Sequence, residues 1–277
     1  MTTALSLETG HELTRGPRSS AYLGAMLQGM NTTSVALVTG ASRGLGLAVA
    51  RAYAQRGLRL ILTARSADGL ERAAGELGAT TEVEALAGDV ADNEHAERLV
   101  QRGQERFGQI DVLINNASEL GPSPMPTLEE LPANALDTIL RVNVAAPLRL
   151  IQLVLPGMRA RRTGLIVNVT SDAAVNAYPT WGGYGASKAA LEHLSRILAA
   201  ELEDTGVRVF VVDPGDMNTA MHEAAEPGVD LSHLPGPEVV APAFVQLLDE
   251  ATPFGRFEAQ KLSAFSHQPS AAAAATH

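Results

Sequence analysis

Short apolar runs alternate with longer amphipathic stretches along most of this sequence. The apolar runs predict strands at 35–39, 58–64, 82–88, 110–115, 164–170 and 207–212. The amphipathic stretches predict helices near 45–56, 68–77, 92–107, 128–160, 183–203 and 238–250. Most of the predicted strands carry Val, Ile and Leu at successive positions, which is typical of parallel strands covered on both faces. The alternation predicts an α/β fold, in which a doubly wound parallel sheet lies between two layers of helices and binds ligands beyond the carboxyl ends of its strands.

A glycine-rich turn follows the first predicted strand. Its sequence is Thr39-Gly-Ala-Ser-Arg-Gly-Leu-Gly46, and a helix pattern starts directly after it. The three glycines permit a tight turn, close approach of the backbone to a pyrophosphate and close packing of the helix on the strand. A glycine cluster alone more often marks an ordinary loop. Its place between a strand and a helix predicts a dinucleotide site at the amino terminus of that helix.

Tyr184 and Lys188 lie four residues apart in a predicted helix, and Ser171 precedes the tyrosine by thirteen residues. Side chains at this helical spacing project from the same face, so the ammonium is expected beside the phenol. A nearby cation stabilises the phenolate and lowers the tyrosine pKa from its ordinary value of about 10. The pair is therefore expected to exchange a proton with a carbonyl-derived oxygen, which the Ser171 hydroxyl would also hydrogen-bond.

These motifs and others along the chain resemble the short-chain dehydrogenase/reductase family in its ordinary single-domain form. The resemblance runs from about residue 34 to about residue 248. It rests on motifs in the family's order: Thr39 to Gly46, Gly88-Asp-Val90, Asn115-Asn-Ala117, Asn143, Ser171, Tyr184-x-x-x-Lys188 and Pro214-Gly215. The resemblance implies a Rossmann fold and a nicotinamide cofactor that carries hydride to or from a carbonyl carbon.

The resemblance also implies a role for each matching residue. Tyr184 is expected to protonate the carbonyl oxygen, Ser171 to polarise and orient it, and Lys188 to lower the tyrosine pKa and hold the nicotinamide ribose. Asn143 is expected to anchor a water-linked proton relay, although an amide in a helix is more often a surface or capping residue. The implied cofactor-binding residues are Gly40, Ser42, Arg43, Gly44, Leu45, Gly46, Arg65, Asp89, Val90, Asn116, Ala117, Tyr184, Lys188, Pro214, Gly215, Met217 and Thr219.

Two positions, Asp89 and Ser118, allow more than a simple match to the family's pattern. Asp89 is expected to accept a hydrogen bond from the adenine amino group, with Val90 beside the ring, and a simple turn or helix-capping role is the alternative. The family usually writes Asn-Asn-Ala-Gly where this chain has Asn115-Asn-Ala-Ser118. The Ser118 side chain is therefore expected to alter the pocket floor while the backbone keeps its role.

Charge near the end of the second predicted strand indicates the cofactor. NAD-preferring relatives usually place an acidic residue there, where it hydrogen-bonds the ribose 2′-hydroxyl. This chain has Arg65 instead, with Arg43 inside the glycine-rich turn. Guanidinium groups suit a phosphate through paired donors, so NADP(H) is the predicted cofactor. The alternative is that Arg65 only caps a solvated loop, in which case the protein would discriminate weakly between NADP(H) and NAD(H).

Three functions fit these residues. The favoured one is an NADP(H)-dependent oxidoreductase that reduces a ketone or aldehyde to an alcohol, or the reverse, on a small or medium apolar substrate. A catalytically silent protein that senses NADP(H) is the alternative from another class, but it has no need to keep Asn143, Ser171, Tyr184 and Lys188 together. An epimerase or dehydratase is disfavoured because such relatives usually carry a larger carboxyl-terminal substrate domain.

Composition limits the partners and the compartment. The 277 residues include no cysteine, which excludes disulfides and fits a reducing cytoplasm, and the seven histidines show no metal-ligand spacing. A net charge of −10 disfavours non-specific attraction to nucleic acid or to an anionic membrane. No run reaches the roughly 18 apolar residues that a membrane helix needs. A cytoplasmic protein with a small-molecule carbonyl or alcohol ligand is therefore predicted.

One domain is predicted over residues 34–262, with a substrate lid at about 216–236 that is rich in Pro, Gly and polar residues. Residues 1–33 are interpreted as a disordered leader or a non-native start, with a partner-binding arm as the alternative. Residues 263–277 are predicted to be a disordered tail. The family's frequent Val-Asp-Gly-Gly turn is missing, so only 255–262 can supply a last strand. A homodimer through helices 128–160 and 183–203 is favoured over a tetramer.

The remaining aromatic and histidine residues carry weaker signals. Tyr178 has no lysine four residues later and is expected to line the substrate pocket or pack in the loop. Trp181 is expected either to form a pocket wall or to pack in the core. His193 is expected to lie on a helix face without chemistry, and His222 and His233 fall in the predicted lid.

Overall fold

The computed structural model describes residues 34–265, so the predicted leader at 1–33 and most of the predicted tail, 266–277, lie outside the described part. The strands are β1 (Val35–Thr39), β2 (Arg59–Ala64), β3 (Val83–Ala87), β4 (Val112–Asn115), β5 (Gly164–Val169), β6 (Val207–Asp213) and β7 (Phe254–Glu258). The helices are α2 (Gly44–Gln55), α3 (Ala67–Leu77), α4 (Asn93–Phe107), α5 (Ala133–Leu140), α6 (Ala146–Arg161), α7 (Gly182–Glu201), α8 (Ala220–Ala225), α9 (Pro237–Asp249) and α10 (Ala259–Phe265). A π-helical turn, η1 (Arg141–Ala145), and a 3₁₀ turn, η2 (Asp172–Ala174), complete the chain.

The strands form one parallel sheet in the order β3-β2-β1-β4-β5-β6-β7. This order confirms the predicted doubly wound topology. The first six strands match the six predicted runs to within two residues at either end. The strand order reverses beside β1, where the chain passes from the β3 edge to β4, and a crevice opens at such a switch point beyond the carboxyl ends of the strands.

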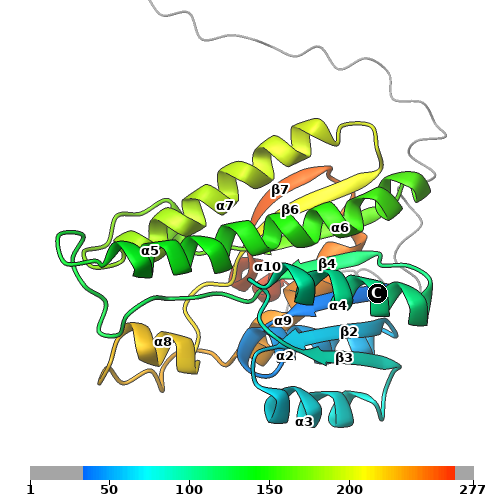
Figure 1. Cartoon of the computed structure of the whole chain (residues 1–277). Helices are drawn as coiled ribbons and strands as arrows, with labels where there is room; N and C mark the ends of the chain where they lie inside the picture. Colours follow the sequence, from blue (N-terminus) through cyan, green and yellow to red (C-terminus); the bar gives the residue numbers. More distant parts are fainter. Residues whose placement is uncertain (1–33, 266–277) are drawn as a thin grey trace, which may run out of the picture.

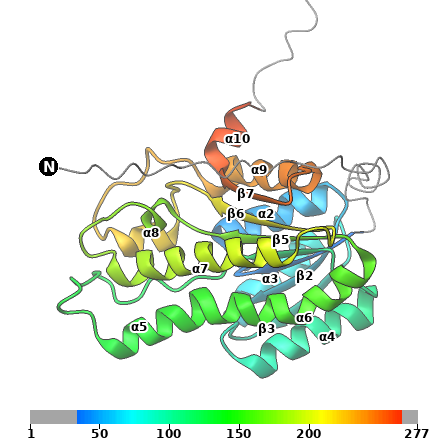
Figure 2. The ribbon, with the colours of Figure 1, turned by 90° about the horizontal axis from the view of Figure 1, so that it is seen from above.

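Helices cover both faces of the sheet and give the predicted three layers (Figures 1 and 2). One apolar cluster packs α2, α3 and α9 against the sheet, and the other packs α4, α6 and α7 against its opposite face. Successive residues of β1 alternate between them: Ala36 and Val38 belong to the first cluster, Val35 and Leu37 to the second. Successive strand side chains point to opposite faces, so a strand that is apolar throughout supplies both cores.

The predicted helix 128–160 is wrong at its start and in its middle. Helix α5 begins only at Ala133, because Pro132 disfavours a helical conformation for the residue before it and serves as the N-cap. The stretch then changes to the π-helical turn η1 at Arg141 before α6 continues the same rod. Single π-turns inside helices occur frequently at functional sites, and this one holds Asn143.

Two features near the carboxyl terminus refine the prediction. Segment 255–262 does supply the last strand, since β7 pairs in parallel with β6. Helix α10 then runs to Phe265, three residues past the predicted domain end at 262, so residues 263–265 are helical and not part of a disordered tail. The predicted lid contains α8, whose amino terminus the Thr219 hydroxyl caps by accepting from the His222 N–H.

The rod formed by α5, η1 and α6 spans Ala133–Arg161 and is, by length and composition, apolar enough to cross a membrane, with a mean hydropathy of 1.4 in its best window. This corrects the expectation that no such segment exists. Its apolar side chains, among them Leu150, Ile151 and Val154, are buried in the core against the sheet. The rod is thus accounted for as a core helix of the domain.

Candidate active site

Helix α7 presents Tyr184 and Lys188 toward the carboxyl end of β5. Lys188 is 2 % exposed, and its Nζ donates to the Val169 carbonyl at 2.9 Å. The same Nζ lies 5.4 Å from the centroid of the Tyr184 ring. The predicted neighbourhood of ammonium and phenol is therefore present, with the ammonium over the ring face while the backbone carbonyl of β5 holds it in place.

Burial moves the pKa of both groups. It lowers the pKa of Lys188 to about 8. It raises the pKa of Tyr184 above the ordinary value, and the carboxylates of Asp213 and Asp172 act in the same direction, while the hydrogen bond with Ser118 opposes them. The net shift is opposite in direction to the predicted lowering of the tyrosine pKa, because loss of water around the phenol is its largest cause, and the contribution expected from Lys188 stays a prediction. Tyr184 is therefore a protonated acid at neutral pH.

Ser171 lies two residues beyond the end of β5 and is the N-cap residue of η2. Its hydroxyl donates to Asp172 Oδ1 at 3.1 Å and accepts from the Ala173 N–H at 3.1 Å. The turn packs against α7, since a Cβ added at Gly185 would meet the Ala173 carbonyl oxygen at 2.7 Å. Gly185 follows Tyr184 directly, so this close approach places the turn that Ser171 caps next to the start of α7, which carries Tyr184.

Asn143 lies in the π-helical turn and is 1 % exposed, which excludes the surface alternative. Its Nδ2 donates to the Glu119 carbonyl at 2.8 Å and to the Ser187 hydroxyl at 2.9 Å. Its Oδ1 accepts from the Glu119 N–H at 2.7 Å and from the Ser118 hydroxyl at 3.1 Å. The amide therefore joins the loop after β4 to α7, one turn beyond the tyrosine.

The glycine-rich turn has the geometry that close backbone contact requires. A Cβ on Gly46 would lie 2.4 Å from the Gly40 carbonyl oxygen, so only glycine fits there, and Gly40 itself has a φ of +67°. Gly44, with a φ of +56°, faces open space instead. Ser42 and Leu45 belong to the same turn, and Arg43 is the N-cap residue of α2, whose first turn holds no acidic residue.

The turn after β4 is tied to the end of β1. The Thr39 hydroxyl accepts from the N–H groups of Asn116 and Ala117, each at 2.9 Å, and Asn116 Nδ2 donates to the Thr39 carbonyl at 2.9 Å. The Asn116 side chain also lies against the glycine-rich turn, because a Cβ added at Gly40 would be only 2.8 Å from Asn116 Nδ2. These contacts bring the two predicted cofactor segments together at the switch point of the sheet.

Arg65 follows β2 and is 66 % exposed, with its Nη1 3.2 Å from Glu119 Oε2. An exposed ion pair of this kind contributes little to stability, so the guanidinium can be redirected at small cost. The glycine-rich turn lies beside the end of β2, since the Ala41 N–H donates to the Thr63 carbonyl at 3.1 Å. Ser42 approaches the start of α3, where a Cβ on Gly69 would meet Ser42 Cβ at 3.3 Å. The structure thus gathers cationic Arg65 and the glycine-rich turn at one end of the sheet.

Asp89 and Val90 follow β3. Asp89 is exposed and accepts from the Ala91 N–H at 2.9 Å, so its side chain forms the turn that was the alternative to adenine binding. A second carboxylate oxygen remains for a ligand. Val90 is buried against Val142 and Ala146 at the π-helical turn.

The segment after β6 completes the set of predicted cofactor residues. Asp213 Oδ1 accepts from the Gly215 N–H at 3.0 Å, which fixes the turn through Pro214, and Gly215 has a φ of +70°. Met217 is buried in the core, and Thr219 serves as the cap of α8. The turn lies at the carboxyl end of β6, on the same edge of the sheet as Ser171.

The family model described as short chain dehydrogenase matches residues 34–230. The chain is a member of this family. It is 36% identical to 2-(R)-hydroxypropyl-CoM dehydrogenase from Xanthobacter autotrophicus over 68% of this chain and 76% of that protein. It is 38% identical to dehydrogenase/reductase SDR family member 4 from Bos taurus over 67% of this chain and 66% of that protein. The solved alcohol dehydrogenase from the archaeon Thermococcus sibiricus, complexed with 5-hydroxy-NADP, has a TM-score of 0.72 at 34% identity and covers 81% of this chain and 95% of its own.

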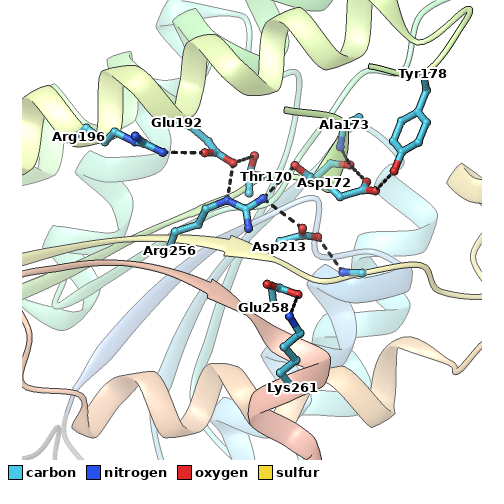
Figure 3. Close-up of polar contacts among 12 residues, drawn as sticks. Thr170, Asp172, Ala173, Tyr178, Glu192, Arg196, Asp213, Arg256, Glu258 and Lys261 are labelled. Atoms are coloured by element: carbon cyan, nitrogen blue, oxygen red, sulfur yellow. Dashed lines mark hydrogen bonds and ion pairs between the residues drawn. The ribbon is translucent and has the colours of Figure 1, made fainter. Parts of the chain in front are cut away.

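This short-chain dehydrogenase also contains a buried ion network of Arg256, Glu192 and Asp213, which the sequence pattern did not predict (Figure 3). The Nε of Arg256, on β7, donates to Glu192 Oε1 at 3.0 Å. Its Nη2 lies 3.3 Å from Asp213 Oδ2. The same Nη2 is 3.5 Å from the Ser171 carbonyl, and Glu192 also accepts from the Thr170 hydroxyl at 2.9 Å. Both carboxylates are buried, and burial keeps the pKa of Asp213 raised in spite of the arginine. Arg256 therefore joins the last strand to the segments that carry Ser171 and Gly215.

Three aromatic rings at the start of α7 are in contact one after another. Trp181 packs edge-on against Tyr178, with ring centroids 6.2 Å apart, and against Tyr184, with centroids 5.8 Å apart. The Tyr178 hydroxyl donates to Asp172 Oδ2 at 2.6 Å. Trp181 thus touches the tyrosine of the site, which favours its role as a pocket wall over packing in the core.

The three histidines that the sequence singled out, His193, His222 and His233, form no hydrogen bond or ion pair with Tyr184 within the described chain. His193 is exposed on α7 and His233 is exposed in the lid segment, whereas His222 on α8 contacts Glu226 at 3.3 Å. Among residues 34–265, no group of three or more histidine or carboxylate side chains is arranged to hold a metal ion.

Proposed function

We propose that this protein is an NADP(H)-dependent oxidoreductase that reduces a ketone or aldehyde to an alcohol, or catalyses the reverse reaction. The observation that carries the proposal is the position of Tyr184, whose ring centroid lies 5.4 Å from the Nζ of buried Lys188, on a helix that the Asn143 amide contacts through Ser187. Burial raises the pKa of the phenol, so it keeps its proton at neutral pH. A group that keeps its proton at neutral pH is suited to donate it to a developing alkoxide. The same set of residues has no evident use in a protein that only senses the cofactor.

The residues present fit a dinucleotide. Open space at Gly44 and a helix terminus free of acidic residues suit a pyrophosphate, because the first N–H groups of a helix attract anions. Arg43 and Arg65 supply the positive charge that a 2′-phosphate needs. When bound, NADP(H) supplies or takes up the hydride, and the solved relative from Thermococcus sibiricus is a complex with 5-hydroxy-NADP.

In the proposed reduction, Tyr184 donates its proton to the carbonyl oxygen as the carbonyl carbon is reduced. Ser171 positions the same oxygen once its hydroxyl turns from Asp172 to the substrate. Lys188, with a pKa of about 8, is largely protonated at pH 7. Its positive charge over the ring stabilises the phenolate that Tyr184 becomes when it gives up its proton. Trp181 and Tyr178 offer an apolar wall, which favours a small or medium apolar substrate.

Arg65→Ala is expected to weaken NADPH binding about 10- to 100-fold and NADH binding by less than about twofold. The reason is that a charge-assisted bond to phosphate contributes roughly 1.5–3 kcal/mol, which the NADH ribose cannot use. Fluorescence titration with both cofactors measures the two affinities. Arg51→Ala is the matched control, because Arg51 is also an exposed arginine in an ion pair, with Glu76, and should leave both affinities unchanged. Equal weakening of both cofactors in Arg65→Ala would refute the 2′-phosphate contact.

Turnover tests the proposed function itself. After titration, a panel of ketones, aldehydes and quinones is added, and oxidation of NADPH is followed by its absorbance. Tight binding with turnover supports the reductase, whereas tight binding without turnover on any carbonyl supports a sensor. A cytoplasmic location and a homodimer through α5, α6 and α7 belong to the same proposal, and analytical ultracentrifugation decides between a dimer and a tetramer.

A further inference from the structure

The ion pair between Arg65 and Glu119 joins the ends of two strands that are not neighbours in the sheet. Arg65 directly follows β2, Glu119 lies in the loop after β4, and Nη1 of the arginine is 3.2 Å from Oε2 of the glutamate. Strands β2 and β4 pair with opposite sides of β1, so the ion pair spans the carboxyl end of β1, where the glycine-rich turn begins. The two side chains therefore meet across the crevice in which a doubly wound sheet binds a dinucleotide.

The backbone of Glu119 is held in place, so only its side chain is free to leave Arg65. The Glu119 N–H donates to Asn143 Oδ1 at 2.7 Å, and the Glu119 carbonyl accepts from Asn143 Nδ2 at 2.8 Å. The other carboxylate oxygen, Oε1, accepts from the Gly121 N–H at 3.3 Å. Opening the ion pair thus requires rotation of side chains and no rearrangement of the loop after β4.

The carboxylate of Glu119 and a cofactor phosphate would compete for the same guanidinium. Within residues 34–265, Glu119 is the one acidic residue in ion-pair contact with Arg65. The guanidinium carries a single positive charge, whereas a phosphate monoester carries close to two negative charges at pH 7. A carboxylate and a phosphate that share one guanidinium repel each other. A 2′-phosphate that binds Arg65 must therefore displace the Glu119 side chain.

We propose that Glu119 is a specificity-determining residue that competes with the cofactor 2′-phosphate for Arg65, an inference that rests on the proposed function. In the cofactor-free chain the carboxylate holds the guanidinium, and NADP(H) takes its place. NAD(H) has a hydroxyl at this position and does not need the guanidinium, so Glu119 lowers the affinity for NADP(H) alone. Glu119 thereby narrows the preference for NADP(H) that Arg65 creates.

The size of the effect follows from the exposure of the pair. The Arg65 side chain is 66 % exposed and that of Glu119 is 23 % exposed. An exposed ion pair shifts an equilibrium by no more than about fivefold. Competition by Glu119 is therefore weaker than the 10- to 100-fold gain expected from Arg65 itself, and NADP(H) remains the preferred cofactor.

The test is fluorescence titration of the full chain with NADPH and with NADH in about 0.15 M salt, where charges more than about 8 Å apart are largely screened. Glu119→Gln removes the charge and keeps an oxygen that can accept from the Gly121 N–H. It is expected to tighten NADPH binding about three- to fivefold and to change NADH binding by less than about 1.5-fold. Glu76→Gln is the matched control, because it removes one carboxylate from the exposed ion pair with Arg51 and should change neither affinity.

A double-mutant cycle shows whether Glu119 acts through Arg65. In the Arg65→Ala background, Glu119→Gln should change NADPH affinity by less than about 1.5-fold, because no guanidinium is left to compete for. The same gain with and without Arg65 would overturn the inference. Unchanged or weaker NADPH binding in Glu119→Gln, or equal tightening of both cofactors, would overturn it as well.

The titrations separate this inference from the proposed function, because they need no substrate. A wild type that binds no NADPH would refute the proposed function and this inference together. A wild type that binds NADPH but shows no coupling between Glu119 and Arg65 in the cycle would refute this inference alone and leave the reductase to be tested by turnover.

Discussion

Tyr184→Phe should lower kcat for carbonyl reduction by about a thousandfold and leave the affinity for NADPH within about twofold of the wild type. A positioned acid contributes roughly 10²- to 10⁴-fold, and phenylalanine keeps the ring that packs on Trp181 and lies over Lys188. Steady-state assays and fluorescence titration measure the two quantities on the same preparation.

Tyr53→Phe is the matched control for this change. Tyr53 is also a buried tyrosine, and its hydroxyl donates to the Phe244 carbonyl at 3.2 Å between α2 and α9. Its substitution should leave kcat unchanged, because this hydroxyl lies in the core and not in the site. Residual activity above about a tenth of the wild type in Tyr184→Phe would exclude the tyrosine as the proton donor.

Arg256→Met should lower the free energy of unfolding at pH 7 by about 3–5 kcal/mol. Methionine fills much of the same volume but leaves the buried carboxylate of Asp213 without its arginine partner and leaves Glu192 with Arg196 alone, at 3.5 Å. An uncompensated buried charge costs about that much. Urea unfolding followed by circular dichroism measures the difference. Because Arg256 also contacts the Ser171 carbonyl, kcat of the folded variant should fall as well.

The pH dependence of this loss follows from the raised pKa of Asp213. The folded carboxyl binds its proton more tightly than the unfolded one does, so its destabilising effect is complete above the folded pKa and disappears below the unfolded pKa of about 4. Removing Arg256 raises the folded pKa further. The deficit of Arg256→Met should therefore shrink between pH 7 and pH 5, whereas exposed Arg98→Met should cost less than about 1 kcal/mol at both values. A deficit that stays constant with pH would contradict the account of the ion network.

Most of the fold could be predicted because its signals are local. Strands covered on both faces must be apolar at successive positions, and that pattern located β1 to β6 within two residues. Strand β7 was harder to predict because its five residues include Gly255, Arg256 and Glu258, and its partner, β6, lies some forty residues earlier in the chain. The break in the helix before Ala133 was readable from Pro132, but the π-helical turn at Asn143 leaves no mark in the hydrophobic pattern.

The residues of the site could be assigned from motifs, but their interactions could not. Asn143 was singled out, yet its four hydrogen bonds depend on the meeting of the loop after β4 with α7, which only the tertiary structure brings about. Glu192 offered a missed signal, because it follows Lys188 by four residues on the same face of α7. Its partner Arg256 lies 64 residues further along, and no local pattern connects the two.

The most direct test of the proposed reaction follows the hydride itself. The protein is mixed with NADPH deuterated at the transferable position and with a panel of carbonyl compounds, and the products are examined by mass spectrometry. The proposed function predicts an alcohol with one deuterium on the former carbonyl carbon, and no such product with Tyr184→Phe. Deuterium that stays on the bound cofactor with every carbonyl offered would contradict the reductase and leave a protein that binds NADP(H) without turnover.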